Sequence, residues 1–146
     1  HAEIVSFTDA IAADEMELIS GVAETLVHLA ERHSVWLVTK GNESEQRGKL
    51  QRSKLAHHFD GVEVLAEKNA AAYSALVERH GWNLNTTWMI GNSPKSDVNP
   101  SLAAGLRAVF IPHPHTWVME EAQLSMQPDG ERLIELKNFT ELAQLF

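Results

Sequence analysis

The sequence predicts a three-layer α/β fold, in which helices cover both faces of a Rossmann-like, mostly parallel sheet. Short apolar runs rich in β-branched and aromatic residues alternate along the chain with longer segments of helical periodicity. Each apolar run is followed by polar residues or proline. This alternation is typical of βαβ units, whose parallel strands are buried on both faces.

The spacing of the apolar residues places each element in turn. The expected strands are 35–39, 62–65, 87–90 and 108–111, and the expected helices are 16–33, 44–57, 69–80 and 100–104. Gly81 and Gly105 directly follow two of these helices, where glycine is a favoured C-terminal residue. Segment 131–136 is compatible with strand or helix, and 140–145 is expected to be a final short helix.

Composition limits the classes of function. The chain has 146 residues, 44% of them hydrophobic, which suffices for one globular domain. No apolar run approaches the ~20 residues that span a bilayer. A formal charge of −8 argues against nucleic acid or an anionic membrane as a partner, but allows a small anionic ligand. The absence of cysteine excludes a thiolate nucleophile and fits a cytoplasmic location.

Polar residues follow the strand expected at 35–39. Ligands of parallel α/β sheets bind beyond the carboxyl ends of the strands. The hydroxyl of Thr39, beside the Lys40-Gly41-Asn42 turn and before a helix, could bind a phosphate together with backbone N–H groups. The alternative is that Thr39 and Asn42 cap the next helix.

Lys68 occupies an unusual position, just after the second strand and before the helix expected at 69–80. A cation there opposes the partial positive charge of the helix N-terminus. Its position is better explained if Lys68 and the helix share an anion. The alternative is a solvated surface lysine paired with Glu67.

The segment 91–97 (GNSPKSD) is the densest polar stretch after a buried strand. Mg²⁺ prefers oxygen ligands and keeps several waters, so the carboxylate of Asp97 with one further ligand elsewhere would suffice to hold it. Asp97 could instead be an ordinary helix N-cap. His113 and His115 have a spacing compatible with metal binding, although a rigid extended loop explains them more simply.

Taken together, these segments resemble the later motifs of the haloacid dehalogenase-like hydrolase superfamily. Segment 35–42 (VWLVTKGN) is similar to its second motif, 67–69 (EKN) to its third, and 89–97 (MIGNSPKSD) with 103–105 (AAG) to its fourth. Segment 20–22 (SGV) resembles the re-entry from cap to core. The similarity runs from about residue 17 to 117, and the ordered set is more specific than any one motif.

The resemblance implies a Mg²⁺-dependent phosphatase-type hydrolase of small phosphorylated metabolites, acting through an aspartyl-phosphate. Thr39, with Lys40, Gly41 and Asn42, would bind the phosphoryl group, and Lys68 would neutralise it. Asp97 would hold Mg²⁺, with Asn92 or Ser93 as a secondary ligand; Asn92 departs from the acidic residue that is commoner there. The alternative is a non-catalytic phosphate- or metal-binding relative. A response-regulator receiver is disfavoured because its acidic residues precede the lysine, and a dinucleotide-binding domain because no G-x-G-x-x-G turn is present.

The first motif of the family, a strand followed by D-x-D, has no counterpart here. Segment 4–10 (IVSFTDA) offers only Asp9. In the family this strand lies at the centre of the sheet. Without it, backbone N–H and C=O groups of the neighbouring strands would be buried without hydrogen-bond partners, which is energetically costly. Either residues 3–7 fill the place or an upstream segment does. We expect that an upstream segment does. Residues 1–16 would then be a remnant of a cap or linker helix, and residues 17–146 a partial core domain that is inactive alone. The expected partner is the missing segment or a second copy of the chain.

Overall fold

All six strands that the structure describes lie in one sheet, and every pairing is parallel. This computed structural model describes residues 3–5, 22–112 and 123–146. The strands are β1 (Glu3–Val5), β2 (Ser34–Lys40), β3 (Gly61–Leu65), β4 (Thr87–Gly91), β5 (Arg107–Phe110) and β6 (Leu133–Glu135). Their order in the sheet is β3-β2-β1-β4-β5-β6. The predicted parallel α/β class is confirmed.

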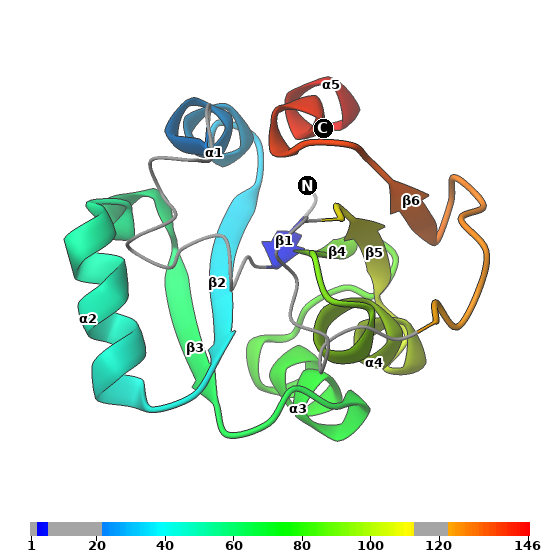
Figure 1. Cartoon of the computed structure of the whole chain (residues 1–146), viewed down its shortest axis with the longest axis horizontal. Helices are drawn as coiled ribbons and strands as arrows, with labels where there is room; N and C mark the ends of the chain where they lie inside the picture. The colour runs from blue at the N-terminus through cyan, green and yellow to red at the C-terminus, as the bar shows by residue number, and fades with distance from the viewer. Residues whose placement is uncertain (1–2, 6–21, 113–122) are drawn as a thin grey trace.

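Helices cover both faces of this sheet. They are α1 (Val22–Ala30), α2 (Glu43–Ser53), α3 (Ala70–His80), α4 (Asn99–Ala103) and α5 (Leu142–Leu145). Figure 1 shows α1 and α5 on one side of the sheet and α3 and α4 on the other. Side chains alternate along β2, so Val35 and Leu37 join the core beneath α1 and α5, whereas Val38 joins the core beneath α3. No helix within the described ranges is long and apolar enough to cross a membrane.

The element boundaries follow local backbone chemistry. The helix expected at 44–57 ends at Ser53, because Lys54 adopts the left-handed conformation (φ 62°) and its N–H donates to the Gln51 carbonyl. A separate 3₁₀ turn, η3 (Ala56–His58), follows. The ambiguous segment at 131–136 contains β6.

Asp129 fixes the turn that leads into β6. Its Oδ1 accepts hydrogen bonds from the backbone N–H groups of Leu133 (3.1 Å), Glu131 (2.9 Å) and Arg132 (2.9 Å). These donors stabilise the carboxylate and lower the pKa of Asp129, with the bond from Leu133 contributing most. The turn therefore positions the last strand of the sheet.

The expectation that the central strand comes from outside this chain is wrong for this structure. β1 occupies the central position: Glu3 to Val5 pair with Ser34 to Trp36 of β2 and with Thr87 to Met89 of β4. Ile4 and Val5 favour extended backbone, and both neighbouring strands offer hydrogen-bonding groups. Residues 3–5 thus belong to the sheet and not to a cap helix. The expected boundary between residues 16 and 17 lies outside the described residues.

An aromatic cluster joins β2 to the end of α3. The rings of Trp36 and Trp82 meet edge to face at 5.5 Å between centroids, and His80 stacks on Trp82 at 5.0 Å. Glu63 of β3 accepts from Arg79 and contacts the Nε2 atom of His80 at 2.7 Å. The two tryptophans therefore help to pack the end of α3 against the sheet.

Gly61 provides a direct test of this packing. A Cβ atom at this position would lie 2.2 Å from Cζ3 of Trp36. We predict that Gly61→Ala lowers the free energy of unfolding by about 1–3 kcal/mol, because the indole and the strand cannot both keep their places. Urea denaturation followed by tryptophan fluorescence measures the change.

Gly48→Ala is the matched control. In α2, the added Cβ would meet only the end of the flexible Arg52 side chain, at 3.2 Å from Nη1. This variant should gain about 0.5–1 kcal/mol from reduced backbone freedom. Equal effects of the two substitutions would contradict the packing at Gly61.

Candidate functional site

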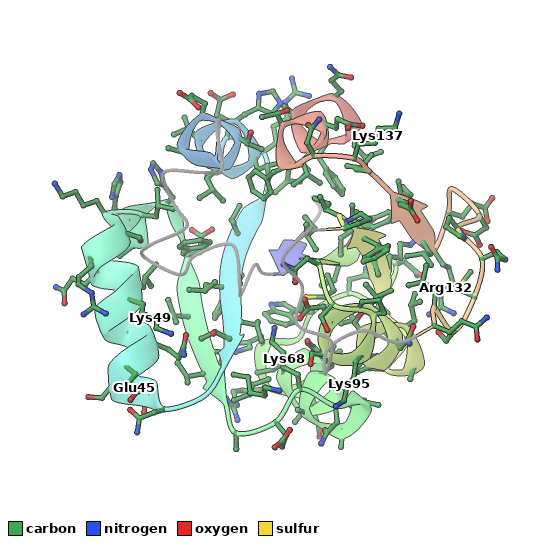
Figure 2. All side chains as sticks on the ribbon, viewed as in Figure 1. Glu45, Lys49, Lys68, Lys95, Arg132 and Lys137 are labelled. Carbon is green, nitrogen blue, oxygen red and sulfur yellow. The ribbon has the colours of Figure 1, made fainter. Side chains whose placement is uncertain are left out.

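The site lies at the carboxyl edge of the sheet, where β2, β3 and β4 end. Thr39 is near the end of β2, Lys68 lies in the connection after β3, and Asp97 lies in the turn after β4. Figure 2 shows Lys68 and Lys95 at the lower edge of the sheet, near the start of α3. In the sheet order, β2 and β1 separate β3 from β4. The connections after β3 and β4 must therefore cross this edge to meet.

They meet in a buried ion pair. Lys68 Nζ donates to Asp97 Oδ1 at 2.5 Å, and the two side chains are only 3% and 1% exposed. Glu67, by contrast, is exposed. The alternative of a solvated Lys68 is therefore wrong. Each of the two charges requires the other, because an isolated charge out of water is strongly disfavoured.

Asp97 is positioned by a turn that sequence periodicity did not reveal. Residues Pro94–Val98 form a single π-helical turn, η4, ahead of α4. Ser93 caps this turn by accepting from the Ser96 N–H at 3.0 Å, so Asp97 is not the N-cap. The backbone N–H of Ser93 donates to Asp97 Oδ2 at 3.2 Å, and the hydroxyl of the buried Tyr73 donates to the Ser96 carbonyl at 2.8 Å.

Gly91 makes room for this carboxylate. A Cβ atom there would lie 2.3 Å from Asp97 Oδ2 and 2.5 Å from Asp97 Cγ. Any larger residue at the end of β4 would displace the acid. The glycine before Asn92 is thus explained by the close approach of Asp97 to the strand.

Thr39 forms the second part of the site. Its side chain is buried, and its hydroxyl donates to Gln46 Oε1 of α2 at 3.0 Å. Gln46 was missed by the sequence analysis, because a polar residue in the first turn of a helix gives no sign of pointing back toward the preceding strand. Lys40 is half-buried at the end of β2.

The turn after Thr39 is held by hydrogen bonds of its own. The Gly41 N–H donates to the Leu65 carbonyl at 3.0 Å, which extends the pairing of β2 with β3. Asn42 Oδ1 accepts from the Glu45 N–H at 3.1 Å and caps α2. Asn42 therefore caps α2, which agrees with the alternative that it is a helix cap. The phosphate-binding roles of Thr39, Lys40, Gly41 and Asn42 stay predictions.

The donor chemistry around Asp97 fits one protein ligand of a Mg²⁺ ion. A buried carboxylate supplies the hard oxygen that Mg²⁺ prefers, and the ion takes its other ligands from water and substrate phosphate. Within the described ranges, no group of three His, Asp or Glu side chains comes together as a complete metal cage. Asn92 is half-buried beside this turn, and Ser93 Oγ already accepts from Ser96. Their roles as secondary ligands stay predictions.

Some candidates fall outside the described residues. These are Asp9, the single acid of segment 4–10, and the two histidines His113 and His115. The His57-His58 pair lies in η3, where His57 is exposed and His58 is half-buried. Burial, followed by the charge of His57, lowers the pKa of His58.

The structure is an α/β protein with a parallel sheet and a buried lysine–carboxylate pair at its carboxyl edge, the edge where ligands bind in folds of this class. Comparison with known families makes this specific. The model of the haloacid dehalogenase-like hydrolase family matches residues 2–111, and the chain belongs to that family. No curated protein matches the chain.

Solved structures share the fold. A haloacid dehalogenase-like family hydrolase from Xanthomonas campestris is 29% identical with a TM-score of 0.75, covering 87% of this chain and 52% of its own. A phosphatase of the family from Thermococcus onnurineus is 20% identical with a TM-score of 0.67, and the match covers 91% of this chain and 63% of that protein. A 2-haloacid dehalogenase from Pseudomonas syringae is 21% identical (TM-score 0.65; 86% and 51% covered). This chain therefore spans about half to two thirds of these proteins, and the fold is common to two chemistries.

Gly91→Ala tests how Asp97 is seated. We predict a loss of about 1–3 kcal/mol in the free energy of unfolding, since the new Cβ and the carboxylate cannot occupy the same space. Gly81→Ala is the comparison: it has a positive φ (66°) but no atom within 4 Å of the added Cβ, so it suffers only backbone strain. Asp97→Asn should not relieve the Gly91→Ala defect, because asparagine has the same shape. Wild-type stability of Gly91→Ala would contradict the close approach.

Proposed function

We propose that the intact protein is a Mg²⁺-dependent phosphatase of small phosphorylated metabolites that acts through an aspartyl-phosphate, and that this chain alone is inactive. The buried Lys68–Asp97 pair, at the same carboxyl edge of the sheet as the buried Thr39, is the observation that carries the proposal. Phosphoryl transfer needs mainly positioning and charge neutralisation, and these residue types supply both.

Each residue has a distinct role in this proposal. The Thr39 hydroxyl donates a hydrogen bond to a phosphoryl oxygen, and the Lys68 ammonium offsets the charge of the phosphoryl group and of the nucleophile. Asp97 orients Lys68 through their ion pair, and would hold Mg²⁺. When bound, Mg²⁺ neutralises charge on the phosphoryl oxygens. Segment 4–10 offers only Asp9 and no D-x-D, so the nucleophilic aspartate would come from a part of the intact protein outside this chain.

A non-catalytic binding module is the second candidate. One observation favours it: β1 occupies the central position of the sheet, and the segment that continues it in the sequence, 4–10, offers only Asp9 and no D-x-D. Such a protein would keep Thr39, Lys68 and Asp97 only to hold phosphate. It would bind phosphate without turning over an ester.

The test is hydrolysis of p-nitrophenyl phosphate by the intact protein. We predict turnover that requires Mg²⁺ and is abolished by EDTA. Thr39→Val and Lys68→Met should each lower kcat/KM by roughly 100-fold or more, as removal of a transition-state donor does. Glu67→Gln, which changes the exposed neighbour of Lys68, should leave the rate unchanged.

Two results would contradict the proposal. Phosphate binding with no ester hydrolysis would favour the binding module. Release of chloride from 2-chloropropionate, with no release of phosphate from esters, would make the protein a dehalogenase.

A further inference from the structure

The side chain of Gln46 contacts Thr39, near the end of β2, and approaches Gly41 in the turn that follows. Its Oε1 accepts a hydrogen bond from the Thr39 hydroxyl at 3.0 Å. Its Nε2 lies 3.0 Å from the place where a Cβ on Gly41 would stand, so the amide lies across the bare face of that glycine. The backbone N–H of Gln46 donates to the Asn42 carbonyl at 2.9 Å, which fixes the first turn of α2 beneath the amide.

This contact uses the only proton that Thr39 can donate. A threonine hydroxyl has one O–H and two lone pairs, and the proton points to Gln46. A phosphoryl oxygen accepts hydrogen bonds and donates none when ionised. Thr39 therefore cannot donate a hydrogen bond to a phosphate while its hydroxyl donates to Gln46 Oε1.

A primary amide can reverse this polarity without moving its backbone. Rotation about the last side-chain bond exchanges Oε1 with Nε2, and the amide then offers two donors where it offered an acceptor. Nε2 would donate to a lone pair of Thr39 Oγ1, and the released hydroxyl proton would turn to the phosphate. Hydrogen bonds in such a chain strengthen one another.

We propose that Gln46 is a positioning residue for phosphate, and that its amide reverses when the anion binds so that Thr39 becomes a donor. This rests on the proposed phosphate site at Thr39. No covalent step is involved: one hydrogen bond from Thr39 to Gln46 is exchanged for one from Gln46 to Thr39 and one from Thr39 to phosphate.

Substitutions at Gln46 separate the roles of shape, polarity and charge. Gln46→Met keeps the length of the side chain and removes its hydrogen bonds. It should weaken the binding of inorganic phosphate about 3- to 10-fold. Gln46→Glu places an ionised carboxylate there, which accepts hydrogen bonds and donates none, and should weaken phosphate binding by more than about 10-fold. Ser44→Glu places the same charge on the exposed first turn of α2, and should change the affinity by less than about 2-fold.

The experiment is titration of the chain with inorganic phosphate in Mg²⁺ buffer, by calorimetry and by ¹H–¹⁵N NMR of the side-chain amides. The Gln46 amide signals, assigned by their loss in Gln46→Met, should shift with phosphate in the wild type. They should not shift in Thr39→Val. In the Thr39→Val background, Gln46→Met should cost no further affinity.

The outcomes separate this inference from the proposed function. Phosphate binding with an unmoved Gln46 amide, or equal affinity of Gln46→Met and the wild type, would overturn the role of Gln46 and leave the phosphate site intact. Equal losses of phosphate affinity in Gln46→Glu and Ser44→Glu would mean that added negative charge alone weakens binding. That result would also overturn the role of Gln46. No phosphate binding by the wild type, at concentrations up to tens of millimolar, would overturn both.

Discussion

Two opposite charges lie out of water beyond the carboxyl ends of β3 and β4. Taking either Lys68 or Asp97 from water alone would cost several kcal/mol, and their contact at 2.5 Å offsets that cost only while both stay in place. The pair connects loops that two intervening strands separate in the sheet. It therefore fixes the connection after β3 and the turn after β4 relative to each other.

Other features of the edge follow from this constraint. Gly91 has no side chain because Asp97 approaches the end of β4. The π turn η4 and its Ser93 cap set the direction of the carboxylate, and Tyr73 secures the turn to α3 through the Ser96 carbonyl. On the other side of the edge, Gln46 and Asn42 shape the turn that carries Thr39. The result is an edge with a fixed cation, a fixed carboxylate and an orientable hydroxyl.

Much of this could be predicted from the sequence, because the signals were local and periodic. Buried strands show as short apolar runs, and Lys68 stood out as a cation placed against a helix dipole, which pointed to an anionic partner. Its partner proved to be Asp97, a residue already singled out for a different reason.

The remainder depended on contacts that sequence spacing does not encode. β1 has three residues, too few for a periodic pattern, and its place is decided by the open edges of β2 and β4. The left-handed backbone at Lys54 shortens α2 without any glycine to signal it. Gln46 resembles a solvated helix residue until Thr39 is placed beside it. In each case tertiary contacts override local preference.

A double-mutant cycle on the free energy of unfolding tests the central pair most directly. The single variants Lys68→Met and Asp97→Asn are combined in Lys68→Met/Asp97→Asn, and all four proteins are unfolded in urea without Mg²⁺. Lys68→Met should cost about 3–5 kcal/mol, because it leaves a buried carboxylate uncompensated. The double variant should cost less than the sum of the two single variants, by about 2–3 kcal/mol. Additive losses, within about 0.5 kcal/mol, would contradict a buried ion pair as the organising contact of this site.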